Sequence, residues 1–180
     1  MTTATKNLEN DHEHILQLTD IMLAMTKKQS ADVGHVELAL DLVREYADKF
    51  HHAKEEDLLF PLLGEKGFPV KNGPVGVMLA EHEEGRNFIK GAAEAIQSYK
   101  PGNKEALTTV FRNLSGFALL LQNHIYKENN ILFKMADEAL NPAEQERLLK
   151  QFNLAESQAE TEFNAENAIK KIESLATIYL

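Results

Sequence analysis

One pattern, His-x-x-Lys-Glu-x-x-x-Leu-Phe, occurs twice in this chain, at residues 51–60 and again at 124–133. An α-helix turns by about 100° per residue, so a His and a Glu four positions apart lie on one face, one turn apart. Leu59 and Leu132 continue along that side and indicate that it faces a core. Each copy therefore directs an imidazole and a carboxylate inward, where unpaired polar groups are costly. A bound metal ion removes that cost, and two such pairs indicate more than one ion.

The composition limits which ligands such ions can have. The chain has 180 residues, of which 43% are apolar, as expected for a globular protein with a sizeable core. It contains no Cys, which excludes disulfides, iron–sulfur clusters and thiol catalysis and leaves His and carboxylates as the strong metal ligands. The net charge of −9 argues against a nucleic-acid partner, because no excess of Lys or Arg is present to neutralise phosphates.

The apolar segments are too short for a membrane-spanning helix. The longest of them, residues 117–121, is far below the length that crosses a bilayer. Residues 1–10 lack the basic flank and apolar run of a signal peptide. We therefore expect a cytoplasmic, soluble protein with no membrane partner.

Helical periodicity extends along the whole chain, and strand signals are scarce. The pattern predicts four helices, at about 7–28, 36–63, 75–99 and 104–140. Turns are expected at 30–34, at the Gly- and Pro-rich segment 64–74 and at Pro101-Gly102, and Pro61 is expected to stop or kink the second helix. Long helices with short connections favour an all-α fold, an antiparallel up-down-up-down four-helix bundle over residues 1–140.

The remaining residues, 141–180, form a C-terminal extension with one or more additional helices. Leu148 and Phe152 suggest a short helix, and Phe163, Ile172 and Leu175 suggest a longer one with a narrow apolar stripe. Such an extension packs on the bundle or forms a dimer contact. The sequence leaves both alternatives open, so a monomer and a homodimer are both compatible with it.

The internal repeat also includes the first and third helices. The segment 11–14, Asp-His-Glu-His, corresponds to the segment 81–84, Glu-His-Glu-Glu. Each half of the bundle therefore contributes one helix with an acidic residue before His12 or His82 and one helix with His-x-x-x-Glu. Four imidazoles and two bridging carboxylates leave room for a bridging oxygen and exogenous ligands around two six-coordinate ions. A nitrogen and oxygen ligand set suits iron, manganese or zinc, and open positions indicate reactivity.

Neighbouring residues have simpler interpretations. His52 and Glu56 repeat the spacing of His51 and Glu55, but the Lys-Glu frame aligns His51 and Glu55 with the second copy, so His52 and Glu56 are expected beside the ligands or at the surface. Several other residues are expected away from the ions. His14 should face solvent, and His35 should cap a helix or lie at the surface. Lys54 and Lys127 should be solvated, and Tyr46 and Tyr126 should be peripheral. Gly85 and Gly116 should either leave room for a small ligand or allow close helix packing.

The order and spacing of these His and Glu residues, with Leu-Phe after each pair and Pro61 after the first, resemble the HHE cation-binding domain of the hemerythrin family over about residues 7–140. The resemblance implies a four-helix bundle that holds two iron ions with a bridging oxo or hydroxo group. Zinc and manganese are alternative metals. Position by position, it implies six metal ligands, with the two Glu residues as bridges: His12, His51, Glu55, His82, His124 and Glu128.

The sequence departs from the oxygen-carrying hemerythrins at one position. Those proteins have a second His one turn before the third-helix ligand, where this chain has Met78. The four-His, two-Glu pattern is closer to that of iron-centre repair proteins, which usually carry a further domain with cysteine, whereas this sequence has no cysteine. Met78 and the missing cysteine therefore weaken the case for oxygen carriage and for repair.

Three functions are compatible with the pattern. The first is a non-haem di-iron protein that binds or reacts with oxygen, nitric oxide or peroxide; whether it is an enzyme is left open. The second is a module for iron storage, donation or sensing that does not turn over a substrate. The third is a structural bundle held by zinc or manganese.

Overall fold

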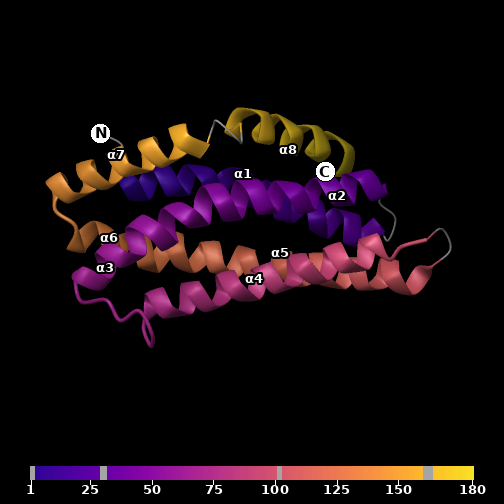
Figure 1. Ribbon diagram of the computed structural model, residues 1–180, viewed down its shortest axis with the longest axis horizontal. Coiled ribbons are helices and arrows are strands. Elements are labelled where there is room, and N and C mark those ends of the chain that lie inside the picture. Colours follow the sequence, from indigo (N-terminus) through magenta and orange to yellow (C-terminus); the bar gives the residue numbers. More distant parts are fainter. Residues whose placement is uncertain (1–2, 29–31, 101–102, 160–163) are drawn as a thin grey trace.

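The computed structural model describes residues 3–28, 32–100, 103–159 and 164–180, and these residues form helices and connecting turns without any strand (Figure 1). The all-α prediction is therefore confirmed. Ser30, Pro101, Gly102 and Phe163, on which some expectations rested, lie outside the described residues.

Four long rods make up the bundle. The first rod is α1 and the third is α4, whereas the second and fourth are continuous runs of α-helical and π-helical segments. Their bounds are α1 Ala4–Lys28; then α2 Val33–Leu42, η1 Val43–His52, η2 Glu55–Leu59 and α3 Phe60–Glu65; then α4 Pro74–Gln97; then α5 Lys104–Lys127, η3 Glu128–Leu132 and α6 Phe133–Ala139. The rods run alternately up and down, α5 packs against both α1 and α4, and α2 packs against α4 (Figure 1).

Local capping explains where several helices begin. Asp32 accepts a hydrogen bond from the backbone N–H of His35, and Asn103 accepts one from the N–H of Ala106, so each side chain satisfies a donor of the first helical turn. Pro74 occupies the first position of α4, where no backbone donor is needed. The side chain that caps this helix is therefore Asp32 and not His35, which is half-buried with its Nδ1 2.9 Å from the hydroxyl of Tyr179, so neither of the two places expected for His35 is the one it takes.

Two rods contain π-helical turns that the periodicity did not predict. The segments η2 and η3 occupy equivalent positions of the repeat, 55–59 and 128–132, and each begins at a Glu that was predicted to bind metal. In η2 the backbone N–H of Phe60 bonds the carbonyl of Glu55, five residues back. The helix continues to Glu65, so it does not stop at Pro61. The π-helical bond from Phe60 to Glu55 shifts the backbone hydrogen-bond pattern by one residue directly before Pro61, and the helix tolerates the N–H that this proline lacks.

The hydrophobic core is divided into two clusters along the bundle axis. The larger one contains Ile15, Tyr46 and Leu121, and the smaller one contains Leu8, Phe60 and Phe133. In the rods, the predicted ligands fall between the residues of one cluster and those of the other. A layer of buried polar side chains therefore separates two apolar regions, and this layer is the place where unpaired polar atoms are most costly.

The C-terminal extension lies against the bundle as two helices, α7 (Pro142–Ala159) and α8 (Ala165–Tyr179), both of which contact α1 (Figure 1). Contrary to the expectation, the first of them is the longer. Phe152 and Leu148 of α7 belong to the smaller cluster, and Ile172 and Leu175 of α8 belong to the larger one. None of the described helices is long and apolar enough to cross a membrane.

Replacing Phe152 with Ala tests the packing of α7. Phe152 is 0% exposed, so its loss should lower the free energy of unfolding of the metal-free protein by about 3–5 kcal/mol. The control is Leu154→Ala on the same helix, where a side chain that is 60% exposed should change stability by less than about 0.5 kcal/mol. Urea unfolding followed by circular dichroism measures both. Equal effects of the two substitutions would show that α7 does not pack as described.

Candidate metal centre

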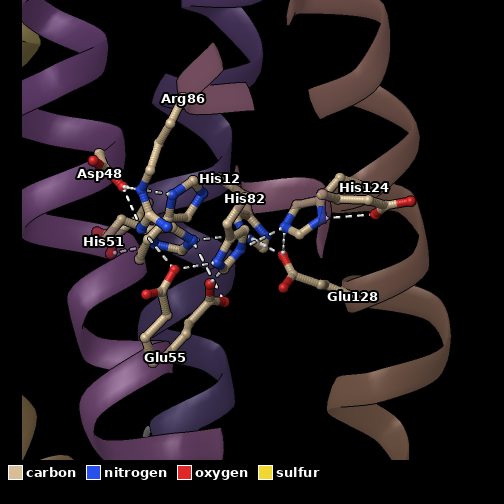
Figure 2. Close-up of polar contacts among 12 residues, drawn as sticks. His12, Asp48, His51, Glu55, His82, Arg86, His124 and Glu128 are labelled. Carbon is tan, nitrogen blue, oxygen red and sulfur yellow. Dashed lines mark hydrogen bonds and ion pairs between the residues drawn. The ribbon is translucent and has the colours of Figure 1, made fainter. Parts of the chain in front are cut away.

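The fold brings all six predicted ligands into the polar layer (Figure 2). Each is at most 2% exposed. The two nitrogens His12 Nε2 and His51 Nε2 lie 2.9 Å apart, and His82 Nε2 and His124 Nε2 lie 3.0 Å apart. The imidazoles thus meet as two pairs, and each pair joins the first and second rods or the third and fourth rods.

The carboxylates of Glu55 and Glu128 lie between these pairs. Glu55 places its oxygens 3.5 Å from His51 Nε2 and 3.5 Å from His82 Nε2, so it spans both pairs. Glu128 Oε2 lies 3.3 Å from His12 Nε2 and 3.2 Å from His124 Nε2 and spans them in the same way. Within the described residues, none of the four carboxylate oxygens has a hydrogen-bond partner of good geometry. Such unpaired buried acceptors call for a cation.

The outward nitrogen of each imidazole is held by an oxygen from a neighbouring rod. His51 Nδ1 donates to Asp11 Oδ2 at 3.1 Å and His124 Nδ1 donates to Glu81 Oε2 at 3.0 Å. The other two pairs are His12 with Asn129 Oδ1 at 2.7 Å and His82 with Glu56 Oε1 at 2.6 Å. Because an oxygen acceptor fixes the proton on Nδ1, all four Nε2 lone pairs face the centre, as they do in metal-ligating histidines.

These outer partners obey the internal repeat. Asp11 and Glu81 stand immediately before His12 and His82, and Glu56 and Asn129 stand immediately after Glu55 and Glu128. The repeat therefore describes the groups that orient the imidazoles as well as the imidazoles themselves. Glu56, which the sequence placed beside the ligands or at the surface, contacts His82 directly.

The pKa values of the buried carboxylates and imidazoles indicate that a positive charge in this layer is favourable. Burial, followed by the nearby charge of Glu128, raises the pKa of Glu55 well above its usual value. Burial would also lower the pKa of His124, but the Glu128 and Glu81 carboxylates outweigh it and raise that pKa to about 9. Burial is the main reason why the pKa of His51 falls to about 4. The pKa shifts of Glu55 and His124 thus both reflect carboxylates that are crowded together in a buried layer, where a nearby positive charge is favourable.

The arrangement fits two metal ions. One group of buried donors within 4.8 Å of one another consists of His12, His51, Glu55 and Glu128, and the other consists of His52, Glu55, His82 and His124. Glu55 belongs to both groups, as a bridging carboxylate would. The second group contains His52, which the sequence placed beside the ligands or at the surface; its exposure of 6% excludes the surface.

Other expectations had mixed outcomes. Tyr126 is 65% exposed and thus peripheral, as expected, whereas Tyr46 is buried and its ring stacks on Phe50, because the rod packs this face against the core. His14 is half-buried with its ring edge against Tyr46, so solvent is not its sole neighbour. An added Cβ at Gly116 would lie 2.5 Å from Phe88, so close packing accounts for this glycine.

Lys54 was expected to be solvated, and that prediction is wrong. Its side chain is 1% exposed, and its Nζ donates to Asp11 Oδ2 and to Glu156 Oε1, each at 2.6 Å, and to Asn7 Oδ1 at 3.0 Å. Helix α7, which carries Glu156, covers this lysine, and no pattern in the sequence indicates that contact. Asp11 thus connects Lys54 to His51.

The repeat-equivalent Lys127 has a simpler environment. It pairs with Glu81, which also accepts from His124, but its side chain remains 33% exposed. In both halves of the centre, a lysine therefore pairs with a carboxylate that also accepts a hydrogen bond from a ligand histidine. The halves differ in how deeply the lysine is buried.

A cavity of about 350 Å³ reaches the centre from one side. Its walls come from the second, third and fourth rods, and its inner end is lined by His52, His82 and His124 together with Gly85 and Phe117. Gly85 thus leaves room beside the centre, which was one of the two roles considered for it. The volume exceeds what a diatomic molecule needs and gives small ligands a path to this half of the centre.

Comparison with known proteins agrees with this geometry. The chain matches the hemerythrin HHE cation-binding domain over residues 3–136, and it belongs to this family. It is similar to the iron-sulfur cluster repair protein YtfE of Salmonella paratyphi B and of Salmonella newport, with 30% identity over 127 residues, which are 69% of this chain and 56% of each relative. The match thus spans little more than half the length of these relatives. No solved structure matches significantly.

The two lysines provide a matched pair for mutation in the metal-free protein. Lys54→Met removes the buried cation that Asp11 and Glu156 share and leaves only His51 beside Asp11 and Asn7 beside Glu156, so it should lower the free energy of unfolding by about 3–5 kcal/mol. Lys127→Met removes a partly exposed pair and should cost about 0–1 kcal/mol. Denaturant unfolding at neutral pH measures the difference, and a larger loss for Lys127→Met would contradict the contrast described above.

Proposed function

We propose that this chain is a non-haem di-iron protein that binds or reacts with a small ligand, namely oxygen, nitric oxide or peroxide. The observation that carries the proposal is the set of four buried carboxylate oxygens, from Glu55 and Glu128, that lack hydrogen-bond partners among the described residues and lie between two pairs of imidazole nitrogens. When bound, the two irons supply the redox and ligand-binding chemistry.

The residues of the chain have separate roles in this proposal. His12 and His51 would hold one ion, His82 and His124 would hold the other, and both would share Glu55 and Glu128, since each of these carboxylates lies near one imidazole nitrogen of each pair. Asp11, Glu56, Glu81 and Asn129 orient the imidazoles. The apolar clusters on both sides of the layer limit access of bulk water, and the cavity beside His82 and His124 admits the ligand.

A second candidate function is iron donation, storage or sensing without turnover. The observation that favours it is the similarity to proteins named for iron–sulfur cluster repair. The same ligands would then release iron to a partner. Facile loss of iron to a chelator, without unfolding of the chain, would distinguish this function from the first.

Metal analysis combined with visible spectroscopy tests the proposal. Protein purified from iron-supplied cells should contain two irons per chain, and its charge-transfer bands should change when oxygen, peroxide or nitric oxide is added. Zinc or manganese alone, with no spectral response, would contradict the proposal and favour a structural metal site.

Replacing Glu128 with Ala should remove one bridge and cause the loss of at least one iron per chain. The control is Glu84→Ala, which removes an exposed carboxylate of α4 and should leave the iron content unchanged. Iron content is measured by atomic spectroscopy after both proteins are purified in parallel. Full occupancy of both sites in Glu128→Ala would exclude Glu128 as a bridge.

A further inference from the structure

His52 is buried beside one half of the centre although it lies outside the repeated pattern. Its ring stacks on His82 with centroids 3.8 Å apart, and it meets the His124 ring edge-on at 6.0 Å. It shares with His82, His124 and Glu55 the group of donors that lie within 4.8 Å of one another. Its position is therefore that of a donor to this half.

The two nitrogens of His52 have different environments. Nδ1 lies 3.3 Å from Asp48 Oδ1, and Arg86 holds Asp48 by bonds of 2.9 Å from Nε and 2.8 Å from the guanidinium NH2. Asp48 paired with Arg86 is a carboxylate, which can only accept, so the imidazole proton resides on Nδ1. The lone pair of Nε2 is then free to bind a cation.

This arrangement is the same as that of the four predicted ligands. Each of those imidazoles gives its Nδ1 proton to an oxygen of a neighbouring side chain and turns Nε2 toward the centre. His52 follows this rule with Asp48 as its acceptor, and Arg86 links the acceptor to Glu56, the partner of His82, at 2.7 Å. One network of charged groups therefore orients both His52 and His82.

The other half of the centre has nothing equivalent at the matching positions. The repeat places Ile125 opposite His52, Leu121 opposite Asp48 and Leu16 opposite Arg86. These side chains can neither bind a metal nor hold an imidazole. His52, its acceptor Asp48 and the arginine that holds Asp48 thus occur together in one half. In the other half, apolar residues occupy all three matching positions.

The geometry points to His52 Nε2 as a third imidazole donor to the metal ion held by His82 and His124. This inference rests on the proposed di-iron function. It makes the two ions unequal, with three imidazoles on the ion that adjoins the cavity and two on the other. A different ligand count gives the ions different affinities and different numbers of positions for exogenous ligands.

Cobalt(II) substitution tests the inference through proton NMR. A ligating imidazole that keeps its Nδ1 proton gives a strongly shifted, solvent-exchangeable signal near a paramagnetic cobalt ion. The wild-type protein loaded with cobalt should therefore show five such signals, one for each of His12, His51, His52, His82 and His124. Four signals would overturn the inference even if no variant folds, because this measurement uses the wild-type chain.

His52→Ile provides the matched variant, since Ile is the residue that the repeat places in the other half. It should lose one shifted signal and bind the ion of that half at least about tenfold more weakly. The control is His14→Gln, which changes a histidine outside the centre and should leave all five signals in place. Unchanged signals and affinity in His52→Ile would also overturn the inference.

The outcome separates this inference from the proposed function. Wild-type protein that binds two irons and responds to ligands, but shows four shifted signals when loaded with cobalt, would contradict the role of His52 alone. Protein that holds no iron after loading would contradict the proposed function itself.

Discussion

Two buried carboxylates, Glu55 and Glu128, determine how the rest of the molecule is built. Their oxygens lie in a layer between two hydrophobic clusters and lack hydrogen-bond partners among the described residues. Buried carboxylates without a compensating positive charge are strongly destabilising. The imidazoles that turn their Nε2 atoms toward this layer, and the oxygens that hold their Nδ1 protons, complete an environment suited to cations.

The two halves of the bundle share this design but meet different surroundings. In one half, Lys54 and Asp11 are covered by α7 through Glu156, so the support of His51 is buried. In the other half, the cavity reaches His82 and His124, and Lys127 remains partly exposed. A symmetrical pattern in the sequence therefore produces a centre that is closed on one side and accessible on the other.

The π-helical turns belong to the same design. They begin at Glu55 and Glu128, where the chain must direct a carboxylate into the layer while the leucines and phenylalanines that follow enter the smaller cluster. A wider turn changes the angle between successive side chains, and such turns are frequent at functional sites. It also lets the second rod continue through Pro61 to Glu65.

The sequence by itself determined the helical rods, their alternating directions and the six inward side chains, because these follow from local periodicity and from a repeat within the chain. It could not place Lys54, Tyr46 or His52, since their burial depends on which surfaces of distant helices cover them. Lys54 is enclosed by α7, about a hundred positions away along the chain, and Asp48 and Arg86 come from different rods. Only the tertiary structure decides such contacts, because helical periodicity specifies a face of one helix and carries no information about what packs against it.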